Sequence, residues 1–454
     1  MSSHQRDHLA DSVEPAPAVA VPIDPADIET AVRVLGQLQH LDHDDPGYIA
    51  VRQATATMFK QVKKSSRLAR RARIAAADQA VVAATATGAP DRIDDETRGV
   101  QLQAVTATSL SAGTLLVARN CYICKQPYTT VDAFYHQLCS DCAAQGHAKR
   151  SARTDLIGKR ALLTGGRAKI GMHIALRLLR DGAHTTITTR FPRDAVRRFS
   201  SIDDSDMWLQ RLKIVGIDLR DPAQVIGLAE NVAAAGSLDI LINNAAQTVR
   251  RSPGAYGPLA EAELAPLPAG PLPELVTFGH TNDAHPQALA ASVAAHPILA
   301  TATRRADHLA AEAMTAGSSS LERLVAGTAI DAGGLLPDEH HINSWTQHVD
   351  QIDSLEMLEV QLANVTAPFL LVSQLRPVLA ASAARRTYIV NVSAMEGVFG
   401  RGYKGPGHPH TNMAKAALNM LTRTSAREMF ESDGILMTSV DTGWITDERP
   451  HFTK

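Results

Sequence analysis

The sequence has almost no net charge, no long apolar run and few cysteines, and each absence narrows what the protein can be. Its 454 residues carry a net charge of -2, which gives no general attraction to nucleic acid or membrane. We find no apolar run long enough to span a bilayer, and residues 1–7 lack the charged and apolar regions of a secretory signal. We therefore expect a soluble cytoplasmic protein, and the hydrophobic content of 45% is enough for a substantial core.

The few cysteines are arranged as a metal-binding motif. Cys121, Cys124, Cys139 and Cys142 form the pattern C-x2-C-x14-C-x2-C. Two thiolates three positions apart on a tight turn reach the same ion, and a second such pair completes a tetrahedral S4 shell. Disulfides are less favoured, because adjacent pairs without a signal peptide fit a reducing compartment better. We predict a structural zinc, since four protein ligands leave no position for water, and His136 is then a packing or surface residue.

The region before the cysteines is predicted to be helical. Residues 1–23 are rich in Ala, Pro and charge without periodicity, which is typical of a disordered tail. In residues 24–114, a helix is expected from Asp24 and Pro25, and the break at 44–47 separates it from a longer second helix. A third short helix is expected after the break at 88–90. The region is Ala-rich and is a candidate oligomerisation element.

The second helix carries two stripes of opposite character. One is apolar, and the other holds the cations Lys60, Lys63, Lys64, Arg67 and Arg71. A basic stripe is typical of nucleic-acid binding. The alternative is a solvated face, or a partner for acidic groups in an assembly. Because no aromatic residues interleave the charges, we favour the alternative and do not expect nucleic acid as a partner.

Residues 151–454 alternate strands and helices. An apolar strand at 160–163 runs into a glycine-rich turn at 164–171, and a helix follows. Such a turn lets backbone amides approach a pyrophosphate at the helix N-terminus. Further strands are expected at 185–189, 213–218 and 238–244. The pattern predicts an α/β fold with a doubly wound parallel sheet, preceded by a zinc module at 115–150.

These motifs resemble the short-chain dehydrogenase/reductase family over about residues 155–447. The resemblance implies a nicotinamide cofactor, a small-molecule substrate and a set of site residues in chain order. The cofactor loop would include Thr164, Gly165, Arg167, Lys169, Ile170 and Gly171, followed by Asp218 and Leu219 after the third strand and by Asn244, Ala245 and Ala246 after the fourth. Asn364 matches the asparagine of the proton relay, Lys415 the catalytic lysine, and Thr442 and Gly443 the segment beside the nicotinamide.

The sequence departs from the family at its proton-handling positions. Thr411 stands where the family has its tyrosine, and threonine is no acid near neutral pH. The serine position is Ala394, with Ser393 one residue upstream. The candidate replacements are Ser393, Tyr403, His408 and His410. Histidine titrates near neutrality and could replace the missing acid, while a His-Pro-His segment is also typical of a surface turn.

Charge at the end of the second strand favours one cofactor. Arg190 follows that strand, with Arg193 nearby, and no acidic residue stands there to bind a ribose 2′-hydroxyl. A guanidinium suits a 2′-phosphate, so we expect NADP(H) rather than NAD(H). The alternative is an exposed Arg190 that only caps the strand.

Two segments depart from the family in length. A long insertion at about 247–355 is expected to act as a lid or subunit contact over the crevice, with candidate helices at 287–300 and 305–316. The chain also ends at Lys454, before the family's seventh strand, which would leave the sixth strand as an exposed edge. An edge of this kind needs cover, from the N-terminal helices, from the insertion or from a second copy of the chain; alternatively the chain is truncated and the natural protein has the strand. We expect a homo-oligomer.

Two functions fit these observations. The first is an NADP(H)-dependent oxidoreductase in which Lys415 orients the nicotinamide ribose, Asn364 holds a water, and His410 or Tyr403 handles the proton. The second is a catalytically silent nucleotide-binding protein that acts in assembly or regulation. Retention of the motifs favours the first, and loss of the tyrosine and serine favours the second.

Overall fold

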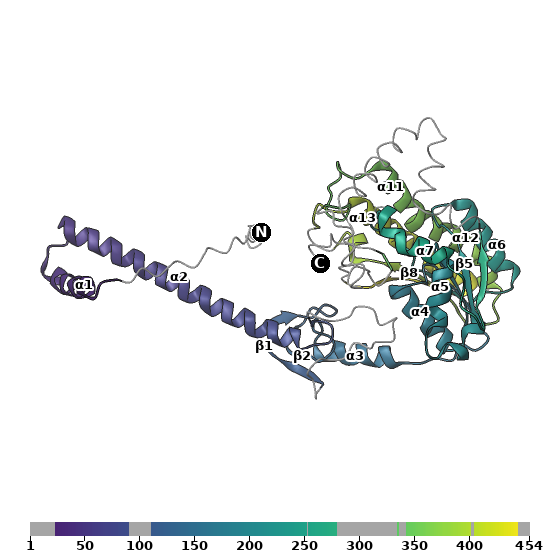
Figure 1. The fold of residues 1–454 in the computed structure, drawn as a ribbon, viewed down its shortest axis with the longest axis horizontal. Helices are drawn as coiled ribbons and strands as arrows, with labels where there is room; N and C mark the ends of the chain where they lie inside the picture. Colours follow the sequence, from purple (N-terminus) through teal and green to yellow (C-terminus); the bar gives the residue numbers. More distant parts are fainter. Residues whose placement is uncertain are drawn as a thin grey trace. The chain divides into compact units, whose positions relative to one another are not determined.

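The computed structural model describes residues 23–89, 110–251, 253–278, 334–335, 342–400 and 404–443. The chain divides into two compact units (Figure 1). The N-terminal unit comprises residues 1–90 and 104–143, and the Rossmann unit comprises residues 91–103 and 144–454. Each unit has a hydrophobic core of its own.

Two helices open the N-terminal unit, as the sequence predicts. Helix α1, Pro25–Gln37, begins where the Asp24 carboxylate accepts a hydrogen bond from the Ala26 amide at 2.8 Å. A short 3-10 turn, η1 (Leu38–His40), and a loop lead to the 38-residue helix α2, Pro46–Ala83. Asp45 caps α2 through the Gly47 amide at 2.7 Å. In both helices proline at the first turn supplies the backbone angle that a helix start needs.

The end of α2 packs on a small hairpin. Strands β1 (Ser111–Asn120) and β2 (Pro127–Asp132) pair antiparallel, with an irregularity in β1 between Thr114 and Arg119. Asp78 of α2 accepts hydrogen bonds from the Leu116 and Val117 amides there, at 2.6 and 3.3 Å. Helix α3, Ser140–Ser151, follows the hairpin. The predicted third helix after residue 90 lies outside the described residues.

A seven-stranded parallel sheet forms the Rossmann unit, which confirms the predicted fold class. The strand order is β7-β5-β4-β3-β6-β8-β9. The strands are β3 (Arg160–Leu163), β4 (His184–Thr189), β5 (Leu212–Gly216), β6 (Ile240–Asn243), β7 (Glu274–Thr277), β8 (Thr387–Ser393) and β9 (Ile435–Asp441).

Helices cover both faces of the sheet (Figure 1). Alternate strand residues enter two separate cores, with Leu163 and Leu162 of β3 on opposite sides. One core holds α4 (Lys169–Arg180) and α5 (Pro192–Ser200), and the other holds α6 (Pro222–Ala234), α12 (Ala367–Ala380) and α13 (Pro409–Asp433). This arrangement places the carboxyl ends of all strands at one edge, where ligands of doubly wound sheets bind.

Part of the insertion extends the sheet, which the sequence did not predict; its role as a lid or subunit contact stays a prediction. After η5 (Pro253–Tyr256), α7 (Gly257–Leu264) packs on α5, and β7 then pairs with β5 in parallel. Within the described residues, β7 and β9 are the two edge strands. The predicted helices at 287–300 and 305–316 lie outside the described part of the chain.

A long apolar helical stretch precedes β8. It consists of α11 (Ser354–Gln361), a π-helical turn η6 (Leu362–Thr366) and α12. By length and composition Ser354–Ala380 could cross a membrane, contrary to the sequence expectation, but half of its apolar window is buried. Leu371, Leu375 and Leu379 pack in the core beneath the sheet. The stretch is therefore a core helix of the Rossmann unit.

Candidate functional site

The glycine-rich turn between β3 and α4 is closely packed. Gly165 has φ +69, and a side chain there would approach Ala245 Cα at 2.9 Å. A Cβ on Gly171 would lie 1.9 Å from the Gly165 carbonyl oxygen. Lys169 occupies the family's middle glycine position and keeps a left-handed φ of 54. The substitution therefore preserves the turn, at a cost of about 1 kcal/mol in backbone strain.

Side-chain hydrogen bonds tie this turn to the end of β6. The buried Thr164 hydroxyl accepts from the amides of Asn244 and Ala245, both at 3.0 Å. The Asn244 amide group donates to the carbonyls of Thr164 and Gly165, also at 3.0 Å. Helix α4 begins after Ala168 without a side-chain cap. Its first amides and the positive end of its dipole therefore suit an anion.

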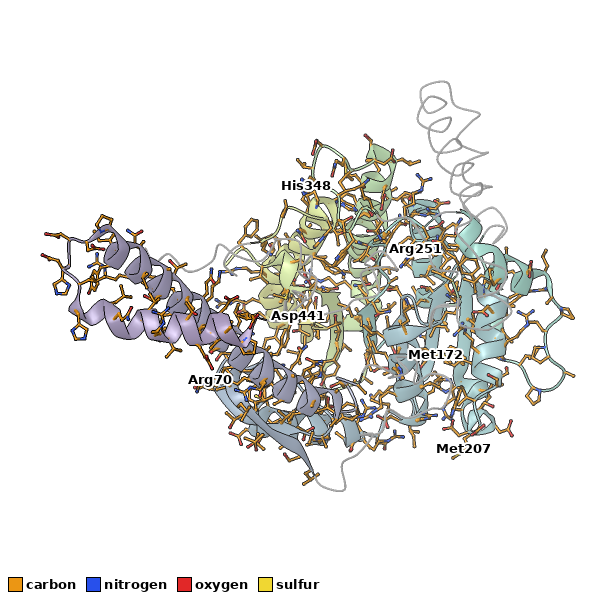
Figure 2. The ribbon with its side chains drawn as sticks, turned by 60° about the vertical axis from the view of Figure 1, so that its left-hand side comes forward. Arg70, Met172, Met207, Arg251, His348 and Asp441 are labelled. Carbon is orange, nitrogen blue, oxygen red and sulfur yellow. The ribbon has the colours of Figure 1, made fainter. Side chains whose placement is uncertain are left out.

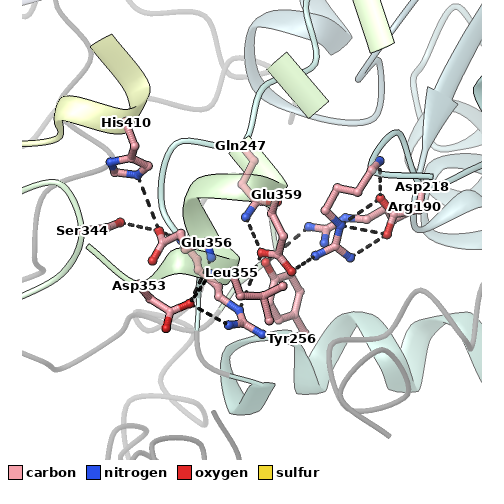
Figure 3. A network of polar contacts seen from close by, with 12 residues as sticks. Arg190, Asp218, Gln247, Tyr256, Ser344, Asp353, Leu355, Glu356, Glu359 and His410 are labelled. Atoms are coloured by element: carbon pink, nitrogen blue, oxygen red, sulfur yellow. Dashed lines mark hydrogen bonds and ion pairs between the residues drawn. The ribbon is translucent and has the colours of Figure 1, made fainter. Parts of the chain in front are cut away.

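Arg190 lies at the end of β4, in an arginine-rich cavity. Its guanidinium donates to the Tyr256 hydroxyl at 3.3 Å and lies 5.2 Å from the centre of that ring (Figure 3). Arg167, from the turn, pairs instead with Asp194 at 2.5 Å. Arg193 donates to the Glu263 carbonyl and so points toward α7. The cavity beside Arg190 is lined by Arg220, Gln247, Arg250, Arg251, Tyr256 and Glu359.

A buried ion-pair network adjoins this cavity (Figure 3). Arg220 binds Asp218 at 2.6 Å and Glu359 at 2.8 Å. Burial alone would raise the pKa of Asp218, but the hydrogen bonds and charge of Arg220 hold it below its usual value. Asp218 is therefore an anion, fixed in place by Arg220. Leu219 packs against the neighbouring hydrophobic core.

Asn364 lies in the π-helical turn, and both polar atoms of its side chain form hydrogen bonds with the backbone of Gln247. Its side-chain oxygen accepts from the Gln247 amide, and its side-chain nitrogen donates to the Gln247 carbonyl, both at 2.7 Å. The pair fixes the segment that follows Ala246. Turns of this kind often occur at functional sites. The prediction that Asn364 holds a water is untested, and its side chain has a structural role here.

Lys415 is buried at the end of β8. Its ammonium donates to the Val392 carbonyl at 2.9 Å. Burial lowers the pKa of Lys415 to about 8, opposed by the charge of Glu396. Thr411, one helical turn earlier on α13, is also buried and donates to the Thr248 carbonyl at 3.4 Å. Ser393 is buried as well, with its hydroxyl 3.5 Å from the Lys415 carbonyl.

His410 is a buried residue, so of the two alternatives for this segment the exposed surface turn does not apply to it. It is 2% exposed, and its Nε2 lies 4.0 Å from Glu356 (Figure 3). Neither ring nitrogen has a hydrogen-bond partner among the described residues. Burial and the nearby His408 lower the pKa of His410. His408 stacks on Trp345 with ring centres 3.9 Å apart.

The remaining predicted residues flank the crevice or lie outside the description. Gly443 has φ +82, and its amide donates to Asp441 at 3.0 Å; Thr442 precedes it after β9. Ile170 is exposed at the start of α4. Tyr403 lies outside the described residues.

The four cysteines converge in the N-terminal unit. All four Sγ atoms lie within 4.8 Å of one another, and those of Cys124 and Cys139 are 3.6 Å apart. Edges of about 3.8 Å are expected for a tetrahedron of thiolates about 2.3 Å from a central zinc. Backbone hydrogen bonds lower the pKa of Cys121 to about 6 although burial opposes this, which favours a thiolate. His136 is no part of the cluster and binds the Thr87 hydroxyl at 2.8 Å.

Comparison with known proteins agrees with these motifs. Residues 159–262 match the family model described as short chain dehydrogenase. This segment of the Rossmann unit, from β3 to α7, is therefore similar to short chain dehydrogenases. A short chain dehydrogenase/reductase of Colletotrichum higginsianum is 35% identical over 95 residues, which cover 20% of this chain and 23% of that protein.

A longer match extends beyond that segment. An uncharacterized protein of Acanthamoeba polyphaga mimivirus is 31% identical over 320 residues, which cover 68% of this chain but only 59% of that protein. Among solved structures, a metagenomic short-chain oxidoreductase in complex with NADP is 17% identical, with a TM-score of 0.38 over 64% of this chain and 83% of that one.

The Rossmann unit also contains site residues that the sequence did not single out. Glu359, Gln247 and Tyr256 line the arginine-rich cavity, and Ser344 donates to Glu356 at 2.5 Å. Gln247 directly follows the Asn-Asn-Ala-Ala motif at 243–246, and this position could have identified it as a site residue from the sequence. Ser344 and Tyr256 belong to the insertion, and no spacing rule relates them to the sheet.

Proposed function

We propose that the Rossmann unit binds NADP(H) and catalyses hydride transfer to or from a small carbonyl or alcohol substrate. The observation that carries this proposal is Lys415, an ammonium kept buried at the end of β8 with a pKa lowered to about 8. Burying a lysine charge is costly, and such perturbed groups concentrate at functional sites.

The residues at the crevice fit a phosphorylated dinucleotide. The uncapped start of α4 suits a pyrophosphate, and the glycine-rich turn brings its backbone to the same place. Arg190, Arg220, Arg250 and Arg251 line the adjoining cavity, where Glu359 is the acidic lining residue. This excess of positive charge supports NADP(H), with Arg190 contacting the 2′-phosphate. The NADP of the metagenomic oxidoreductase agrees with this choice.

Residues of the protein would donate the proton, position the substrate and hold the walls of the site. When bound, NADPH supplies a hydride to a carbonyl carbon. Lys415 has two ammonium hydrogens beyond the one that binds Val392, so it can hold the ribose hydroxyls and donate a proton to the carbonyl oxygen. Thr411 positions a substrate hydroxyl group by hydrogen bonding but supplies no proton. Asn364 holds the Gln247 backbone, and Asp218 with Arg220 holds the opposite wall.

A catalytically silent nucleotide-binding protein is the second candidate. It is favoured by Thr411 and Ala394 at the two positions where the family carries its proton-handling hydroxyls. The two candidates share the cofactor site and differ in turnover.

Single-turnover oxidation of NADPH, followed with a panel of aldehydes, ketones and quinones, separates them. We expect turnover with at least one substrate, and a loss of about 100-fold or more in Lys415→Met. Lys149→Met, an exposed lysine on α3, is the matched control and should turn over like the parent protein. Tight NADPH binding without turnover of any substrate would favour the silent protein.

We also propose that Cys121, Cys124, Cys139 and Cys142 hold one structural zinc. The cluster draws Cys121 and Cys124 from the turn between β1 and β2, and Cys139 and Cys142 from the start of α3. A metal there would fix a small unit whose own hydrophobic core is modest.

A further inference from the structure

Most of helix α2 carries charge of one sign. Between residues 46 and 77 the sequence has no Asp or Glu but contains Arg52, Lys60, Lys63, Lys64, Arg67, Arg70, Arg71 and Arg73. The acids that flank this segment are already engaged. Asp45 caps the helix, and the buried Asp78 accepts the Leu116 and Val117 amides of β1. No acid within the helix therefore offsets the cations.

The basic segment is exposed on every side. Residues 56–73 are all exposed, including Arg70 (Figure 2). Across the described ranges, none of the eight cations forms a salt bridge, and the contact recorded for Arg52 is with the Tyr48 ring, 5.9 Å from its centre. Within the described part of the chain, these cations therefore have no acidic partner.

The segment is also self-repelling. Lys60 and Lys64, Lys63 and Arg67, and Arg67 and Arg71 are each one helical turn apart. Like charges at this spacing destabilise a helix, and here no tertiary packing compensates. A polyanion would turn this repulsion into attraction.

We propose that α2 docks on double-stranded DNA, with its cations on the phosphates of a major groove. From Arg52 to Arg73 the helix rises by about 32 Å, close to the roughly 34 Å of one duplex turn. At about 100° per residue, the cations spread over roughly half of the helix circumference, so they can reach both walls of the groove. A groove about 12 Å wide admits a helix of this diameter.

Other polyanions fit α2 less well. Opposite its basic face the exposed apolar side chains Met58 and Val62 are interrupted by the small residues Ser65, Ala69 and Ala72, whereas a helix at a membrane surface needs a continuous face of large apolar residues. Phe59 is the sole aromatic residue between 56 and 73, so bases of a single strand have little to stack on. The major groove of duplex RNA is too narrow for a helix. Of these polyanions, duplex DNA fits α2 best. This differs from the expectation from the sequence, which disfavoured nucleic acid because no aromatic residues interleave the charges.

Fluorescence anisotropy tests this with the full-length chain and a labelled duplex of about 20 base pairs, titrated between about 50 and 200 mM NaCl. The variant Lys63→Gln/Lys64→Gln/Arg67→Gln removes three phosphate contacts and keeps helix propensity. We expect its salt slope to shrink by about 2.7, and its affinity at the lowest salt to fall about tenfold or more. The control Arg385→Gln/Arg386→Gln/Arg423→Gln removes the same charge from exposed positions on the Rossmann unit and should bind like the parent protein.

Circular dichroism first establishes that both variants keep the parent's helical content. The proposal is overturned if the parent fails to bind at the lowest salt, or if both triple variants lose affinity equally. Equal binding of the parent to polyglutamate or to phosphatidylserine vesicles would also overturn it, and would assign α2 to an acidic protein or to a membrane.

Discussion

Lys415 makes the proposed chemistry dependent on pH in a definite direction. Its pKa is lowered to about 8 by burial, so the ammonium that donates the proton is present below pH 8 and is lost above it. The rate of carbonyl reduction should therefore be flat below about pH 8 and fall about tenfold per pH unit above it. Stopped-flow pH profiles measure this, and a profile that rises through the same range would contradict an acid role for Lys415.

The sequence predicted which residues meet at the glycine-rich turn, because the close packing of that turn restricts which side chains fit. Thr164, Gly165, Gly171 and Asn244 meet because close packing leaves room for no other side chains there. Lys169 shows the limit of such reasoning, since the sequence indicated a lost glycine but not that the left-handed backbone is kept.

The orientation of His410 follows from helix geometry. Thr411 and Lys415 are four residues apart and share one face of α13, whereas His410 is rotated by about 100° from Thr411. It therefore lies against Glu356 rather than beside Lys415. Adjacency in sequence was a poor guide on a helix, and the proposed role of His410 as the replacement acid has no support from its position.

At the scale of elements, helix starts and central strands were predictable, and the edge strand β7 was not. Two helices start at an Asp-Pro pair, Asp24-Pro25 and Asp45-Pro46, in which the carboxylate caps the helix and the proline supplies the backbone angle of the first turn. By contrast, β7 is four residues of the insertion whose pairing with β5 depends on contacts distant in sequence. No local pattern distinguishes such a segment from a loop.

The four-cysteine cluster allows a test of the proposed zinc site at the scale of elements. If zinc joins β1, β2 and α3, Cys139→Ser should destabilise the N-terminal unit by about 3 kcal/mol or more, because metal binding contributes to folding. Metal analysis of the parent should find about one zinc per chain. A strong chelator should lower the melting temperature of the parent but not of the variant. Identical melting of parent and variant would refute the zinc site.

At the scale of the whole molecule, β9 is expected to be covered by assembly. Within the described residues its one strand partner is β8, and an uncovered edge promotes association. Light scattering coupled to size exclusion should give a multiple of the 48.6 kDa chain mass. Val440→Lys on this edge should shift the population toward smaller species, while Ile226→Lys on α6 should not. A monodisperse monomer at micromolar concentration would rule out the homo-oligomer.

The central claim, that this chain is a nicotinamide-dependent protein with a preference for the 2′-phosphate, is tested most directly by calorimetric titration with NADPH and NADH. We predict tighter binding of NADPH, and a preference that falls by about 1 to 3 kcal/mol in Arg190→Ala. Arg198→Ala, an arginine of α5 that pairs with Asp194, serves as the control and should leave the preference in place. Equal affinities of the parent for both dinucleotides, or no binding of either, would contradict the account.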